Sequence, residues 1–146
     1  MGAPGYCRAM LAARAVTAAV LAVLAALHVA WGMGSSFPMT DDDHLADAVA
    51  GSPVTPSPAA CFAVAGALAS ASALVAGAPR RDSRIRQAGT IVVAGVFAGR
   101  ALLGFTGRTD LVAPGGAVSE RFSHLDRTRY SPLCALIAAG ALLSRR

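Results

Sequence analysis

Long apolar runs constrain this chain more than any other feature, and the run from Ala88 to Gly107 is the most informative of them. It contains no charged residue except Arg100. A helix of about twenty apolar residues crosses the ~30 Å hydrocarbon core of a bilayer. A guanidinium at that depth costs roughly 3 kcal/mol on insertion scales, so it must face protein, water or a lipid headgroup. The sequence therefore predicts a membrane-spanning helix whose single charged side chain, Arg100, faces a polar partner.

Three further apolar runs occupy residues 11–33, 59–78 and 131–144. The chain is 55% hydrophobic and only 14% charged, whereas soluble domains carry about 25% charged residues. We therefore expect an all-α fold, an integral membrane bundle of four transmembrane helices that forms a single domain over 1–146. The first run follows Arg8 as a secretory signal would, but it exceeds the ~7–15 apolar residues of a signal. It also lacks a convincing cleavage site, so we expect it to remain as a span.

The basic residues, all arginines, predict the orientation. Arginine accumulates in the cytoplasmic loops of membrane proteins. The N-terminal segment, the second loop and the C-terminus hold Arg8, Arg14, Arg80, Arg81, Arg84, Arg86, Arg145 and Arg146, whereas the first and third loops hold Arg108, Arg121, Arg127 and Arg129. This distribution predicts a multi-pass plasma-membrane protein with both termini in the cytoplasm. No basic stripe alternates with aromatic residues, so we expect no nucleic-acid binding.

Short interfacial helices are expected in loops 1 and 3. In loop 1, Thr40 is the predicted N-cap, Asp43 its capping-box partner and Gly51 the terminator. The acidic run followed by His44 could alternatively hold a divalent cation through oxygen ligands. Capping already accounts for the run, so we expect no metal. In loop 3, apolar residues recur at i, i+4 and i+7, which predicts an amphipathic helix containing Val118, Phe122 and Leu125.

The fourth run is short for a membrane span. Ser131 suits an N-cap and Pro132 the first helical position, so the helix is expected to start there. From this start to Ser144 it would be about 21 Å long, against ~30 Å of hydrocarbon. Three explanations remain open: the helix start is sunk in the outer leaflet, the preceding amphipathic segment covers it, or the bilayer is thinner there.

The predicted topology brings polar side chains to a similar depth near the outer ends of the first, third and fourth spans. The expected polar pocket comprises His28, Trp31, Arg100, Asp126, Tyr130 and Cys134. In one interpretation the pocket faces outward, and Arg100 and the N-terminus of the fourth helix bind an anionic group. In the other, Arg100 pairs with Asp126 or with carbonyl groups and sets the register of the helices.

The cysteines leave further alternatives open. Cys134 near a helix N-terminus is either a reactive thiol or a small packing residue. Cys61 starts the second span on the same side, so a Cys61–Cys134 disulfide is conceivable. His28 is the only histidine within a span, which disfavours bis-histidine haem, and we expect no cofactor. Gly95 and Gly99 would permit close helix crossing within the bundle or between subunits.

Several blocks of the sequence resemble a known family. The most specific is R-T-R-Y-S-P-L-C at 127–134 together with the segment 121–126 that precedes it. The blocks at 28–32 and 100–105 extend the similarity. The chain resembles the small bacterial membrane proteins grouped as domain of unknown function family 3995. The resemblance implies a four-helix membrane protein and supplies no reaction.

These observations favour a non-enzymatic membrane protein, an accessory, lipid-interacting or partner-binding subunit. Its expected partners are the lipid bilayer and a membrane protein or a second copy of the chain. The alternative function is a carrier or binder of a small anion or lipid headgroup around Arg100. A third is a membrane thiol enzyme with Cys134 as nucleophile and His28 as base.

Overall fold

The computed structural model describes residues 4–52, 56–78, 83–111 and 118–145, and every regular element in these ranges is a helix. The all-α prediction is therefore confirmed for the described chain. The elements are α1 (Pro4–Gly32), α2 (Asp42–Ala50), α3 (Pro58–Ala76), α4 (Ser83–Phe105), the 3-10 turn η1 (Thr109–Leu111), α5 (Glu120–Leu125), the π-helical turn η2 (Asp126–Tyr130) and α6 (Ser131–Leu143).

Three of these helices are long and apolar enough to cross a membrane. The qualifying segments are Arg8–Gly32, Pro58–Ala76 and Arg84–Phe105, which correspond to the first three predicted spans. Helix α6 is shorter, as the sequence indicated.

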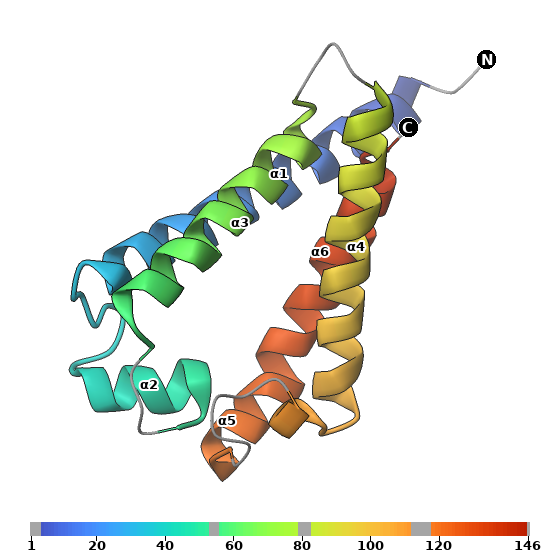
Figure 1. Cartoon of the computed structure of the whole chain (residues 1–146). Helices are drawn as coiled ribbons and strands as arrows, with labels where there is room; N and C mark the ends of the chain where they lie inside the picture. Colours follow the sequence, from blue (N-terminus) through green and yellow to red (C-terminus); the bar gives the residue numbers. More distant parts are fainter. Residues whose placement is uncertain (1–3, 53–55, 79–82, 112–117, 146) are drawn as a thin grey trace.

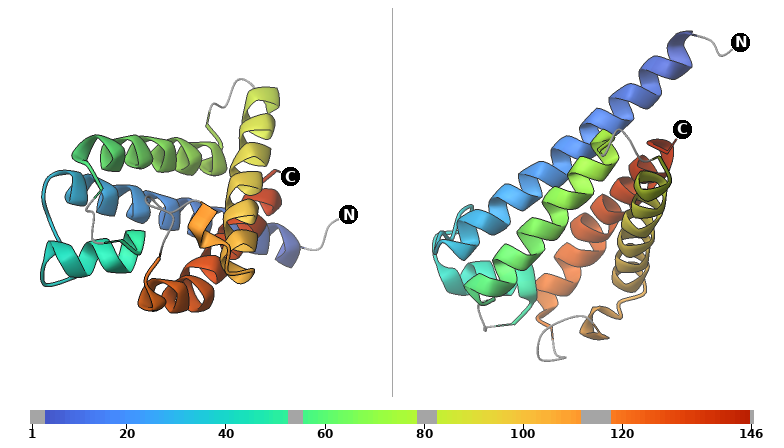
Figure 2. Two further views of the ribbon diagram at one scale, coloured as in Figure 1. Left: turned by 60° about the horizontal axis from the view of Figure 1, so that its bottom comes forward. Right: turned by 45° about the horizontal axis from the view of Figure 1, so that its top comes forward.

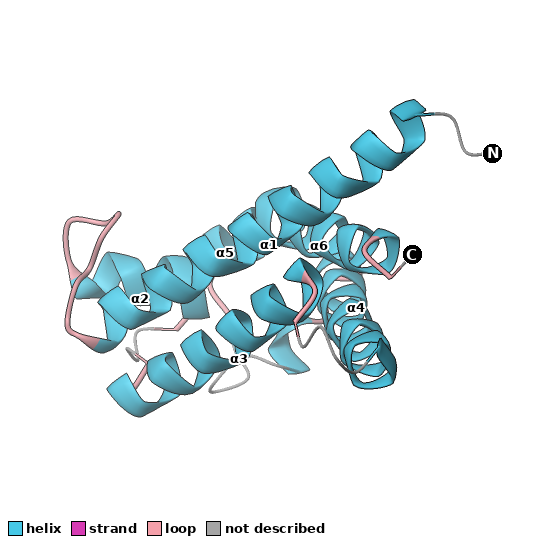
Figure 3. Ribbon diagram, turned by 90° about the horizontal axis from the view of Figure 1, so that it is seen from above, coloured by secondary structure: helices cyan, strands magenta, loops and turns pink. Residues whose placement is uncertain are grey.

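The long helices form two pairs, α1 with α3 and α4 with α6 (Figure 1). The pairs approach each other near the chain termini, which lie at the same end of the molecule, and diverge toward the other end (Figures 1 and 2). Helix α2 lies across this wider end and contacts α5, which lies at the same end and leads through η2 into α6. Figure 3, seen from above, shows α3 running beside α1 and α4 nearly end-on. The fold therefore has a closely packed end and an open end covered by short helices.

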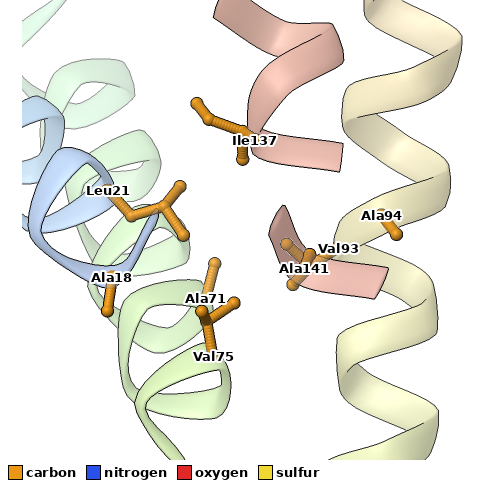
Figure 4. Close-up of a cluster of buried hydrophobic side chains, with 8 residues drawn as sticks. All are labelled: Ala18, Leu21, Ala71, Val75, Val93, Ala94, Ile137 and Ala141. Atoms are coloured by element: carbon orange, nitrogen blue, oxygen red, sulfur yellow. The ribbon is translucent and has the colours of Figure 1, made fainter. Parts of the chain in front are cut away.

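The hydrophobic core lies in the half of the bundle where the pairs converge. All four long helices contribute to it (Figure 4), with Ala18, Leu21, Ala71, Val75, Val93, Ala94, Ile137 and Ala141. Most of these side chains are small, so the backbones approach closely. A Cβ on Gly140 of α6 would collide with Thr17 of α1. The Ser72 hydroxyl donates a 2.8 Å hydrogen bond to the carbonyl of Ala18, joining α3 to α1.

The helix in loop 1 starts one residue later than predicted. Asp41, not Thr40, is the N-cap, and its carboxylate accepts a 2.9 Å bond from the backbone N–H of His44 and a second bond from the His44 ring. The predicted capping box with Asp43 is therefore wrong. An ionised carboxylate serves the cap better here because it can bind both groups. These bonds, the backbone one first, hold the pKa of Asp41 below its ordinary value. Gly51 ends the helix with φ of 68°, as expected.

The predicted break before the fourth span is also wrong. Ser119 caps α5, and the chain then continues through η2 into α6 without leaving the helical region. Ser131 is not an N-cap, because its own backbone N–H donates to the carbonyl of Asp126 within the π turn. The turn lies directly before Pro132, whose ring cannot donate and would clash in a regular α-helix. The helical path from Glu120 to Leu143 is about 36 Å long at 1.5 Å per residue. The amphipathic segment thus extends the short apolar run.

Candidate functional site

An ion pair joins the C-terminal part of α4 to the π turn. Arg100 Nη2 lies 2.7 Å from Asp126 Oδ1, and Nη1 lies 3.3 Å from Oδ2, so the contact is bidentate. Asp126 is 1% exposed and Arg100 is 27% exposed. The buried Ser131 hydroxyl is 3.5 Å from Asp126 Oδ1. The structure therefore contains the Arg100–Asp126 contact on which one of the two interpretations depends.

Gly104 makes this ion pair possible. It lies one turn after Arg100 on the same face of α4. A Cβ at Gly104 would lie 2.6 Å from Asp126 Oδ2 and would collide with the Ser131 hydroxyl. Only glycine therefore lets the α4 backbone approach the π turn this closely. Reasoning from the residues alone missed Gly104 as a site residue, although its spacing of four from Arg100, the one charge in the apolar run, was a usable signal.

A cavity of about 340 Å³ lies between the two helix pairs, beneath loop 1. Five of the six residues predicted for the polar pocket line it: His28, Trp31, Arg100, Tyr130 and Cys134. Asp126 does not line the cavity, because it is buried behind Arg100. The rest of the wall is apolar and comes from α1, loop 1, α2, α4 and α6: Leu24, Leu27, Pro38, Met39, Leu45, Val49, Phe97, Leu133 and Ile137.

Two aromatic residues of the cavity use their polar groups to hold loop 1 in place. Trp31 Nε1 donates a 2.6 Å hydrogen bond to the carbonyl of Phe37. The Tyr130 hydroxyl donates a 2.9 Å bond to the carbonyl of Ala48 in α2. Consequently α2 is tied to the π turn, and neither aromatic donor remains for a ligand. These two side chains supply apolar surface and fix the outer wall.

His28 retains one polar atom. Its Nδ1 lies 2.8 Å from the carbonyl of Leu24. A carbonyl only accepts, so Nδ1 carries the proton and Nε2 of the neutral ring is an acceptor. The ring also packs against Trp31, with centroids 4.7 Å apart. No hydrogen bond to Nε2 is present within the described residues.

Two cysteines whose side chains the structure describes, Cys61 and Cys134, are free thiols. Cys61 is buried in α3 and Cys134 is half-buried in α6, so they lie in different helix pairs. The conceivable Cys61–Cys134 disulfide is not formed. In the described chain Cys134 makes no hydrogen bond to His28, whose Nδ1 is engaged by Leu24. The nucleophile–base contact that a thiol enzyme requires is therefore not found there.

The fourth helix offers no terminus to the cavity. Because α5, η2 and α6 are continuous, the backbone N–H of Ser131 is already bonded inside the π turn. The interpretation in which Arg100 and the N-terminus of the fourth helix bind an anion is accordingly wrong about the helix N-terminus. The acidic run in loop 1 is used for capping, and the described residues contain no group of three potential metal ligands.

Comparisons with known proteins agree with the similarity noticed in the sequence. Neither the curated proteins nor the solved structures gave a match. Residues 21–141 match the family described as "Protein of unknown function (DUF3995)". This range contains the ion pair, the glycine that admits it and every residue that lines the cavity. Since the match covers most of the sequence, the chain belongs to this family.

Proposed function

We propose that this protein is a non-enzymatic, lipid-interacting subunit of the plasma membrane, with four spans and both termini in the cytoplasm. Three long apolar helices support the first three spans. The continuous helix through η2 and α6 supports the fourth, because residues 126–143 are about 27 Å long at 1.5 Å per residue, close to the ~30 Å of hydrocarbon. The common end occupied by both termini fits an even number of crossings (Figure 1).

The arginine distribution makes the open end of the bundle its outer end. The segments near the termini carry most of the arginines, and cytoplasmic ends attract them. Loop 1, α2 and α5 then lie at the outer surface, and the cavity lies in the outer half of the membrane. A hollow at this depth is reached by lipid from the side or by solutes past loop 1.

The cavity between the helix pairs is the observation that carries the lipid-binding proposal. Its wall is mostly apolar with a few polar atoms, as in sites for small amphipathic molecules. Its one charged wall residue is Arg100, whose two Nη atoms are already bound to Asp126. A small anion would meet a neutral pair and lose its own hydration. The geometry thus favours a lipid over the small anion expected as an alternative.

A partner-binding role is supported by a different face. Gly95 and Gly99 of α4 have no neighbouring atom near the Cβ that each lacks, and they lie beside the exposed Val92 and Val96. Another helix could approach closely at this face. Such a partner is a membrane protein or a second copy of the chain.

Native mass spectrometry of the detergent-purified protein tests the lipid proposal. Wild type is compared with Cys134→Phe, which fills the cavity, and with Leu142→Phe, a matched change at an exposed position of the same helix. We expect a lipid-sized adduct on wild type and on Leu142→Phe, and its loss from a Cys134→Phe protein that still elutes as a folded species. Bare protein in all three samples would refute lipid binding. An adduct that persists in Cys134→Phe would place the lipid elsewhere, and the same spectra report the stoichiometry.

A further inference from the structure

A second hollow continues the cavity along the membrane-facing side of the bundle. It has a volume of about 340 Å³ and lies between α1 and α6. Leu133 and Ile137 form part of both walls, so the two hollows adjoin at these side chains. From Leu133 to Leu143 the second hollow follows α6 for about 15 Å. We call it the α1–α6 groove.

The α1–α6 groove is apolar along its length. Its one polar side chain is Thr17, whose hydroxyl donates to the carbonyl of Ala13 at 2.8 Å and is therefore satisfied. Val16 and Leu136 form its rim and are 62% and 70% exposed. In a bilayer this rim faces hydrocarbon, so the groove suits an acyl or prenyl chain that enters sideways.

The polar atoms left in the cavity indicate the head of the same molecule. Arg100 uses one N–H of each Nη group for Asp126 and has further N–H donors. His28 Nε2 is an acceptor when the ring is neutral. The Trp31 and Tyr130 donors are already used by loop 1 carbonyls. The cavity therefore offers the remaining Arg100 donors and the His28 acceptor, and the Arg100–Asp126 pair has no net charge.

A hydroxyl group matches this arrangement because it both accepts and donates a hydrogen bond. A phosphate would approach the Asp126 carboxylate behind Arg100, and both oxygens of that carboxylate are already bound to the guanidinium. A quaternary or primary amine finds no unpaired carboxylate in the cavity wall. Each charged head would also lose hydration without a compensating partner.

We propose that the cavity binds the uncharged, hydroxyl-bearing head of a lipid such as a diacylglycerol, and that the α1–α6 groove holds one of its two acyl chains. This inference rests on the proposed lipid-binding function and specifies its ligand class. Arg100 donates to the head, His28 accepts from it, and the junction at Leu133 and Ile137 passes the chain from the cavity to the groove.

Three lipids with the same chains and different heads test the inference: dioleoylglycerol, dioleoylphosphatidate and dioleoyl-trimethylammonium-propane. Their dissociation constants for the full-length protein in detergent are measured by native mass spectrometry. We expect dioleoylglycerol to bind at least about tenfold more tightly than either charged lipid. That ratio should fall to near one in His28→Leu and recover in His28→Gln, which restores an acceptor. A merely structural role of His28 would weaken all three lipids alike.

The groove is tested separately with Leu136→Trp, which narrows it, and Leu142→Trp, an exposed position of α6 outside it. We expect Leu136→Trp to weaken dioleoylglycerol binding about tenfold and Leu142→Trp to leave it unchanged. Equal weakening by both substitutions, or no effect of either, would overturn the inference that the α1–α6 groove holds a lipid chain. Preference for the phosphatidate, or selectivity unaffected by His28→Leu, would overturn the uncharged head while leaving lipid binding intact. Failure of all three lipids to bind would refute the proposed function itself.

Discussion

Removing the charge of Arg100 should destabilise the bundle strongly, because it leaves a buried carboxylate without its partner. Asp126 is 1% exposed, and apart from Arg100 its carboxylate has only the Ser131 hydroxyl, at 3.5 Å, as a side-chain partner. In Arg100→Met this buried carboxylate would lose its ion-pair partner. Removing one member of a buried pair costs about 3–5 kcal/mol. Arg100 is itself 27% exposed, so we expect a loss near the lower figure, ~3 kcal/mol. This corresponds to more than a hundredfold change in the unfolding equilibrium.

A second substitution separates the effect of the unpaired charge from the effect of the changed side-chain volume. Asp126→Asn in the Arg100→Met background removes the stranded charge at nearly constant volume. Replacing both members of a buried pair is often close to neutral. We therefore expect the double variant to recover at least about 2 kcal/mol relative to Arg100→Met. The Asp126→Asn single variant completes the double-mutant cycle, which gives the coupling energy of the two residues. Arg129→Met is the matched control, because this arginine is exposed on the same π turn.

Unfolding free energies are measured by titrating purified protein with sodium dodecyl sulfate in mixed micelles, following the fluorescence of the single tryptophan, Trp31. A loss below about 1 kcal/mol in Arg100→Met would refute the reasoning, because that is the range of exposed pairs. Strictly additive effects of the two changes would refute it as well. In either case the contact would not hold α4 against the π turn.

Three further predictions follow from local geometry. Gly104→Ala should lower the unfolding free energy by about 1–3 kcal/mol through overpacking. Gly99→Ala, with open space around the added methyl group, should be neutral or stabilising by up to ~1 kcal/mol. Equal effects of the two changes would contradict the close approach of α4 to the π turn. The bonds to His44 lower the pKa of Asp41. At pH values above the ordinary pKa of aspartate, the ionised Asp41 side chain therefore stabilises α2, and this stabilisation is lost as the pH falls through the lowered pKa. Amide exchange in α2 should accelerate at that pH, and an Asp41→Ala variant that retains the pH step would contradict this. Tyr130→Phe removes the hydroxyl bond to α2 and should raise exchange in α2 but not in α3; unchanged exchange would show that the bond does not hold the loop.

The sequence predicted those features that depend on local pattern. Long apolar runs determined which segments became the long helices, since an unbroken apolar helix needs no other information. Gly51 ended α2 as expected because a positive φ favours glycine. The prediction of Thr40 as the N-cap was wrong because the neighbouring Asp41 can also cap, and its carboxylate binds both the backbone N–H and the ring of His44.

The features that could not be predicted depend on tertiary contacts. Ser131-Pro132 is a strong local signal for a helix start, yet the chain continues through a π turn there. That turn presents Asp126 and Ser131 to the side of α4 where Gly104 leaves room and Arg100 supplies the charge. No pattern within residues 126–132 indicates that α4 lies beside this turn. The pocket residues could be chosen by depth alone, whereas the burial of Asp126 behind Arg100 required the structure.

Four membrane crossings with a cytoplasmic C-terminus are the central claim, and cysteine accessibility in intact cells tests it most directly. Single cysteines are introduced by Asp43→Cys in α2, Ala78→Cys after α3 and Ser144→Cys after α6, with the native cysteines replaced by serine. A membrane-impermeant maleimide should label the first in intact cells and the other two only after permeabilisation. Labelling of the Ser144→Cys protein from outside, with the other two sites as expected, would show that the fourth helix does not cross and would contradict the four-span account.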